Sequence, residues 1–152
     1  MFTRKAGEWF TYTGFMYVMR DSTLSRLVEE NFSFEKIHPV YFCGPTFKGD
    51  LPIGACGPTT ASRMERFFEW LILNGIKVIV GKGSLSASGI NVIKGKMMYW
   101  LAIGGVGVLY GSKVKSYKIL RYKDLGPEAL LKIYVKDFPL IVGVDLNGNQ
   151  VI

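Results

Sequence analysis

The most regular pattern along the chain is helical and lies between positions 58 and 74. Apolar residues recur there at the i, i+3, i+4, i+7 and i+8 positions that one helix face presents to a core, namely Met64, Phe67, Phe68, Leu71 and Ile72. Pro58 suits the first helical position, and Asn74-Gly75 is a typical helix stop. The pattern therefore predicts a helix that begins at Pro58 and buries one face.

Apolar and β-branched runs predict four strands, at 8–19, 37–43, 76–80 and 97–103. The first contains Gly14 and is either one strand or a bent pair. Glycines follow the other three, at Gly44 in a loop over 44–54, at Gly81 and at Gly104, and helices follow the glycines. Repeated strand–glycine–helix units imply right-handed crossovers and a parallel sheet whose loops meet at one edge. We predict an α/β domain with a mainly parallel central sheet and glycine-rich strand-to-helix turns.

The remaining segments predict shorter elements. A short helix over 24–28 follows the first strand, with Asp21 or Ser22 as its cap. Toward the C-terminus we expect a strand at 116–120, a helical turn at 126–130, and two strands at 132–135 and 140–146. We interpret this C-terminal part as structural.

Composition favours one folded domain over residues 1–152, because 49% of the residues are hydrophobic and only 20% are charged. The most apolar run, 97–110, is shorter than the roughly 20 residues that a membrane helix needs and is interrupted by glycines. Two cysteines are too few for a disulfide framework, and nothing resembles a signal peptide. We therefore expect a cytoplasmic protein that does not insert into a membrane.

The net charge of +7 admits three classes of partner: nucleic acid, an acidic protein, or an anionic substrate. The lysines are scattered rather than gathered in a run, and no nucleic-acid-binding motif accompanies them. This distribution argues against nucleic acid.

The start of the predicted helix is a candidate anion site. Unpaired N–H groups and the positive end of the helix dipole favour an anion there, and Thr59, Thr60 and Arg63 add two hydroxyls and a cation. The alternative is an ordinary buried helix with a surface arginine, and the spacing alone leaves both interpretations open.

Two more cations stand next to predicted strand ends. Arg20 lies at a strand-to-helix junction, where it is either a ligand-binding residue or a surface arginine. Lys82 lies between two glycines and can approach an anion closely, but no GxxxxGK[ST] pattern supports a nucleotide P-loop. We interpret His38, the only histidine, as a structural or surface group rather than a general base. We interpret Cys43 and Cys56 as small buried side chains rather than metal ligands or nucleophiles.

The central motif resembles a known family. Gly57-Pro58-Thr59-Thr60-Ala61-Ser62-Arg63-Met64 followed by Gly81-Lys82-Gly83 is similar to the β subunit, or C-terminal domain, of class I fumarate hydratases and the related L-tartrate dehydratases. The resemblance covers most of the chain. Other matching segments follow in the same order, among them Tyr12-Thr13-Gly14, Arg20-Asp21, Gly44-Pro45, Ala102-Ile103-Gly104-Gly105 and Asp124-Leu125-Gly126-Pro127.

This resemblance implies a swivelling β/β/α domain that closes over a partner α subunit carrying a 4Fe-4S cluster, in a heteromer with two of each chain. It implies a hydro-lyase that hydrates fumarate to malate reversibly. Arg20, Arg63 and Lys82 would bind the dicarboxylate together with Gly57, while Thr59 would be the base, with Thr60 beside it. L-tartrate is the alternative substrate, and a non-catalytic anion-binding or regulatory module is the alternative of another class.

The chemistry of water elimination supports a partner independently. Removing water from a 2-hydroxy dicarboxylate needs cations for the aci-carboxylate and a Lewis acid for the departing hydroxyl. Two thiols cannot hold an iron–sulfur cluster alone, so this chain is expected to supply no metal ligand. The chain departs from the family in two places: Ser22-Thr23-Leu24 replaces Ala-Ala-His after Asp21, and the N-terminal segment is short.

Overall fold

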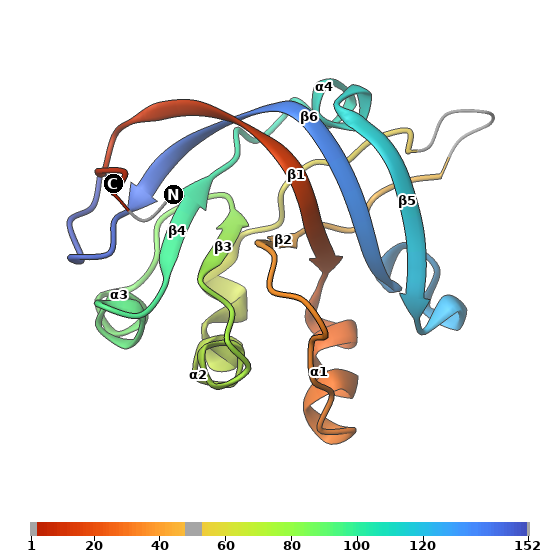
Figure 1. Cartoon of the computed structure of the whole chain (residues 1–152), viewed down its shortest axis with the longest axis horizontal. Coiled ribbons are helices and arrows are strands. Elements are labelled where there is room, and N and C mark those ends of the chain that lie inside the picture. Colours follow the sequence, from red (N-terminus) through yellow and green to blue (C-terminus); the bar gives the residue numbers. More distant parts are fainter. Residues whose placement is uncertain (1–2, 48–52, 152) are drawn as a thin grey trace.

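A computed structural model describes residues 3–47 and 53–151 and contains a six-stranded sheet packed against helices (Figure 1). The loop expected at 44–54 falls partly in 48–52, which lie outside the described residues. The elements in chain order are β1 (Trp9–Met19), α1 (Asp21–Glu29), β2 (Val40–Phe42), η1 (Ala61–Phe67), α2 (Phe68–Leu73), β3 (Val78–Gly81), α3 (Ala87–Ile93), β4 (Met98–Leu101), α4 (Gly107–Ser112), β5 (Val114–Arg121), η2 (Lys123–Glu128) and β6 (Leu130–Val144).

The sheet is mixed, and the prediction of a mainly parallel sheet is not confirmed. Strands β1, β2, β3 and β4 are parallel neighbours in that order. Strand β6 is antiparallel to β4, β1 and β5, and because it pairs with both β1 and β4 it partly closes the sheet. The connection from β5 to β6 through η2 is short. Because parallel strands need a longer crossover, this short connection explains why β5 and β6 are antiparallel.

The two strands expected at 132–135 and 140–146 are one continuous 15-residue strand, β6. Both halves of β6 pair with β1, from Trp9 opposite Ile141 to Val18 opposite Leu131. This continuous pairing keeps β6 one strand although it bends. Asp137, with φ of +54°, marks that bend. The C-terminal strand is therefore central to the sheet because it contacts three others.

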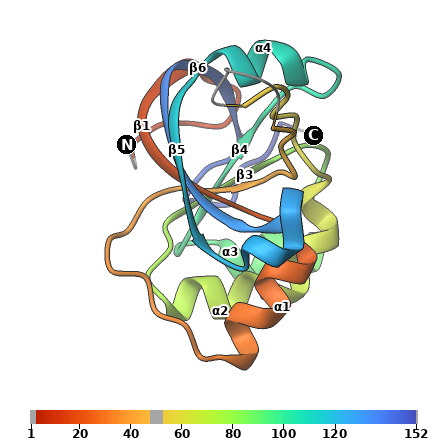
Figure 2. The same ribbon diagram turned by 90° about the vertical axis from the view of Figure 1, so that its right-hand side faces the viewer.

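Two buried clusters lie on the two faces of the sheet. Successive side chains of a strand point to opposite faces, so Tyr41 belongs to the cluster with Trp100 and Phe138, while Phe42 packs with Met64 and the helices. Helices α1, α2 and α3 lie together on one side and α4 lies at the opposite end (Figures 1 and 2). The helices thus cover the face that the Phe42 cluster occupies.

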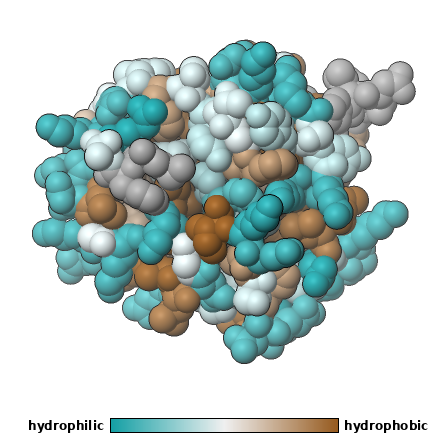
Figure 3. Space-filling view, in the orientation of Figure 1, coloured by the Kyte–Doolittle hydropathy of each residue, from teal (hydrophilic) through white to brown (hydrophobic). Residues whose placement is uncertain are grey.

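The apolar stripe at 64–72 is confirmed, since Met64, Phe67, Phe68 and Leu71 are buried. The first part of the segment, η1, is a 3-10 helix, and α2 ends before Gly75, whose φ is +85°. The face shown in Figure 3 mixes hydrophilic residues with scattered hydrophobic ones. Among the described residues, no helix combines the length and apolarity needed to cross a membrane.

Candidate active site

The carboxyl ends of the parallel strands lie side by side and carry the candidate residues. Arg20 follows β1, Gly44 lies just beyond β2, and Lys82 follows β3. Parallel pairing fixes this arrangement, with Met19 opposite Phe42 in the first pair of strands. The expectation that these loops gather at one edge is confirmed.

A short extended segment fills the space between the ends of β2 and β3. The N–H of Thr59 donates to the Phe42 carbonyl (2.7 Å), and the N–H of Lys82 donates to the Thr59 carbonyl (3.1 Å). The N–H of Ala61 completes the ladder on the Lys82 carbonyl (3.0 Å), and Thr60 forms a bridge with Lys82. Both threonines and the lysine therefore have their backbone positions fixed by one ladder.

This ladder contradicts the prediction that the helix begins at Pro58. Pro58 is not helical but forms an extended bridge with Cys43, and the helix begins at Ala61. The N–H groups of Thr59 and Ala61 are already paired, so they are not free to bind an anion. Strand pairing therefore satisfies two of the donors that were expected to bind an anion, and the anion site itself stays a prediction.

Arg63 is held by a carboxylate from another element. Its Nη2 lies 2.9 Å from Oδ2 of Asp21, in the first turn of α1, with 51% of the arginine side chain and 26% of the aspartate side chain exposed. A guanidinium has five N–H donors, so this pairing orients Arg63 and leaves donors for a ligand. The expected capping role of Asp21 or Ser22 is wrong: Arg20 occupies the N-cap of α1 without a side-chain capping bond.

Arg20 lies across Gly44, a contact that sequence reasoning did not assign. A Cβ built on Gly44 would lie 2.9 Å from Cδ of Arg20 and 3.0 Å from its Nη1. Within the part of the chain that the structure describes, Nε of Arg20 is buried and has no hydrogen-bond acceptor. A buried donor without a partner costs about 1–3 kcal/mol, which makes an anionic ligand at Arg20 favourable.

Lys82 is exposed and its side chain passes Gly104 in the loop after β4, where a Cβ would lie 3.4 Å from Cδ of the lysine. Helix α4, which follows this loop, packs on the central motif, since a Cβ on Gly107 would lie 3.1 Å from the nitrogen of Gly57. This close approach gives Gly107 a packing reason for being glycine, whereas a Cβ on Gly57 would make an ordinary contact, 3.4 Å from Cα of Gly107. The Gly44-Pro45 and Gly104-Gly105 pairs were the sequence signals of these close approaches.

Residues 2–152 match the model of a family described as the fumarase C-terminus. The chain belongs to this family. It is 37% identical over 148 residues to "Fumarate hydratase 1, mitochondrial" of Leishmania major, covering 91% of this chain and 27% of the relative. It is 34% identical over 147 residues to the aerobic class I fumarate hydratase of Escherichia coli K12 (90% and 27%) and 35% identical over 148 residues to the anaerobic one (91% and 27%). The chain spans about a quarter of the length of these relatives.

The cysteines of this fumarase C-terminus domain are buried, as predicted. Sγ of Cys43 lies 3.4 Å from Sγ of Cys56, and both thiols are free. Burial, followed by the hydrogen bond with Cys56, raises the pKa of Cys43 well above its usual range, so this thiol stays protonated. Among residues 3–47 and 53–151, no group of three or more His, Cys, Asp or Glu side chains could hold a metal ion. The chemistry of these residues does not fit an iron–sulfur cluster.

Proposed function

We propose that this chain is the β subunit of an iron–sulfur fumarate hydratase, which hydrates fumarate reversibly to malate at a site shared with a partner α subunit. The observation that carries the proposal is the ladder between β2 and β3. It places Thr59, Thr60 and Lys82 at the strand ends that also carry Arg20, with Arg63 tied to α1 beside them. This is a concentration of cations and hydroxyls suited to a dicarboxylate.

In this proposal the three cations bind the substrate carboxylates and stabilise the aci-carboxylate that forms when the C3 proton leaves malate. Among the residues that the structure describes, Nε of Arg20 is buried and has no partner, and Arg63 has donors beyond its bond to Asp21. Lys82 is a compact exposed charge. Thr59 takes the C3 proton, and Thr60 lies next to it. A threonine is a weak base, so a neighbouring group must draw its proton away.

The proposal assigns the 4Fe-4S cluster, and with it the departure of the hydroxyl, to the α subunit, in a heteromer with two of each chain. Two buried thiols, of which Cys43 stays protonated, are no basis for placing a cluster on this chain. The free cysteines also support a reducing cytoplasm as the compartment.

The test is an anaerobic assay of this chain purified with a cluster-bearing α subunit, with fumarate, malate and L-tartrate as substrates. We expect fumarate hydration by the complex, and Arg63→Ala to lower kcat/KM by an amount equivalent to about 2–4 kcal/mol, because a transition-state charge loses its partner.

Arg26→Ala is the matched control, since Arg26 forms a similar ion pair with Asp124 at 3.0 Å and lies outside the candidate site. A preference for L-tartrate would change the substrate within the same reaction class. Absence of activity on all three, or an equal effect of the two arginine substitutions, would contradict the proposal and favour a non-catalytic module.

A further inference from the structure

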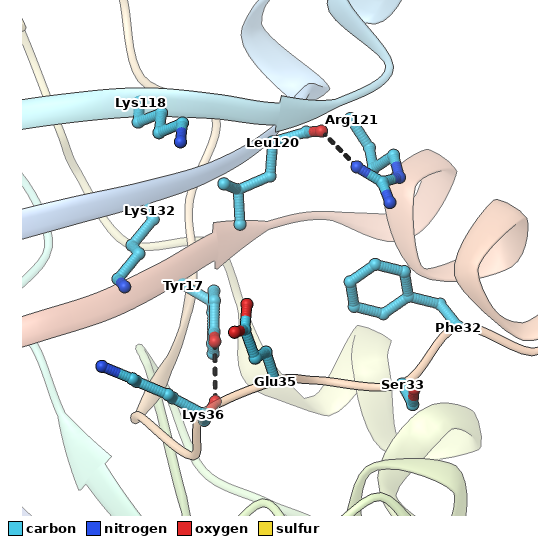
Figure 4. Close-up of a pocket in the computed structure, with 9 residues that line it drawn as sticks. All are labelled: Tyr17, Phe32, Ser33, Glu35, Lys36, Lys118, Leu120, Arg121 and Lys132. Atoms are coloured by element: carbon cyan, nitrogen blue, oxygen red, sulfur yellow. Dashed lines mark hydrogen bonds between the residues drawn. The ribbon is translucent and has the colours of Figure 1, made fainter.

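A second concave site lies apart from the candidate active site. A pocket of about 360 Å³ opens between β1, β5, β6 and the segment 32–36 that follows α1 (Figure 4). Its size is within the range of small-molecule sites, roughly 300–1,000 Å³. None of Arg20, Thr59, Arg63 and Lys82 lines it, so it is not part of the site described above.

The pocket carries an excess of positive charge. Four cationic side chains line it, those of Lys36, Lys118, Arg121 and Lys132, together with one carboxylate, Glu35. Within residues 3–47 and 53–151, none of the four cations lies within ion-pairing distance of a carboxylate. A hollow lined by four cations and a single carboxylate has a positive net charge and concentrates anions.

Strand register places two of these charges face to face. Lys118 of β5 is the direct partner of Lys132 of β6, and Tyr17 of β1 is the partner of Lys132 on its other side. Like charges directly opposite in an antiparallel ladder destabilise the sheet. A local arrangement that opposes folding is characteristic of a functional site, and here an anion between the strands would relieve it.

Aromatic rings orient the cations without neutralising them. The ammonium of Lys132 lies 4.5 Å from the ring centroid of Phe15, and the guanidinium carbon of Arg121 lies 5.6 Å from that of Phe32. The pKa of nearby His38 is lowered by burial and then by the charges of Lys132 and Lys36. The charges of Lys132 and Lys36 therefore both act on this wall of the pocket.

We propose that this pocket binds a small molecule that carries two or more phosphate groups. Lysine ammonium groups and an arginine fork suit phosphate oxygens, and four cations exceed what a simple dicarboxylate would pair with. Tyr17, Phe32 and Leu120 add apolar surface for an organic part such as a nucleoside. The hydroxyl of Tyr17 already donates to the Lys36 carbonyl (2.6 Å), so its ring rather than its hydroxyl is available.

The experiment is calorimetric titration of the full chain with ADP and with inorganic tripolyphosphate at low salt. We compare the unsubstituted chain with a pocket variant, Lys118→Gln/Arg121→Gln, and with a control, Lys77→Gln/Lys96→Gln. The control removes the same charge from exposed positions outside the pocket. We expect about tenfold weaker binding or more in the pocket variant, since two charge-assisted contacts are lost, and under about twofold in the control.

Thermal unfolding separates a binding role from a structural one. Without ligand, Lys118→Gln should leave Tm unchanged or raise it, because the repulsion from Lys132 is removed. ADP should raise the Tm of the unsubstituted chain and raise that of the pocket variant less. The proposal is overturned by three results: no binding of either probe, equal weakening in pocket variant and control, or loss of binding in Lys82→Gln.

Discussion

Gly44→Ala tests how the candidate site positions Arg20. The new Cβ would lie 2.9 Å from Cδ and 3.0 Å from Nη1 of Arg20. The most favourable separation of two non-bonded carbon atoms is about 3.5–4.0 Å, so the arginine is expected to move by roughly half an ångström or more. Misplacing a substrate-binding group by about 1 Å can cost a hundredfold in rate. We expect kcat/KM of the assembled enzyme to fall by between about ten- and a hundredfold.

The same substitution should change folding stability little, because the clash is with a side chain that can move aside. A double-mutant cycle provides the control: in an Arg20→Ala background, Gly44→Ala should have almost no further effect on kcat/KM. Chemical denaturation of both variants checks that the fold is intact. An equal loss of kcat/KM in the two backgrounds, or no loss in either, would refute the reasoning that Gly44 acts through Arg20.

Three further outcomes follow from single contacts. Gly81→Ala should lower the free energy of unfolding in urea by about 1–3 kcal/mol, because the new Cβ would lie 2.9 Å from Cβ of Ala61 in a packed core. A change under about 0.5 kcal/mol would contradict this packing. Burial opposes ionisation of Asp145, but hydrogen bonds from Ala6 and Asn149 among others leave its pKa below the usual value. The folding stability that this carboxylate contributes should therefore be lost as pH falls below about 4. Asp145→Asn should make the free energy of unfolding depend less on pH in that acidic range. Burial lowers the pKa of His38, so the unfolded chain takes up a proton at a higher pH than the folded chain does. Folding stability should therefore decline as pH falls through about 6.5. His38→Gln should remove that decline in thermal unfolding measured across this pH range.

Local patterns predicted the elements of this fold better than their pairing. The apolar run before Arg20 and the stripe from Met64 to Leu71 gave a strand and a buried helical face, and both are present. The partial closure of the sheet depends on β6 pairing with both β1 and β4, which are far away in sequence. Such long-range register leaves no local signature, so the sheet appeared mainly parallel from the sequence.

In the candidate site too, local features could be predicted from the sequence and long-range contacts could not. The order of strands and glycines was enough to bring Arg20 and Lys82 to one edge of the sheet. The ladder that uses the N–H groups of Thr59 and Ala61 could not be predicted, because an extended segment before a helix resembles a helix start in sequence. The pairing of Arg63 with Asp21 joins elements 42 residues apart and likewise had no local signal.

The most direct test of the account is fumarate hydration measured anaerobically while this chain is titrated into a fixed amount of the cluster-bearing α subunit. If the chain supplies half of the site, activity should rise with added chain and saturate at one chain per α subunit. The Arg63→Ala chain should saturate at the same ratio with a much lower rate. Equal activity of the α subunit without this chain, or none at any ratio, would contradict the account.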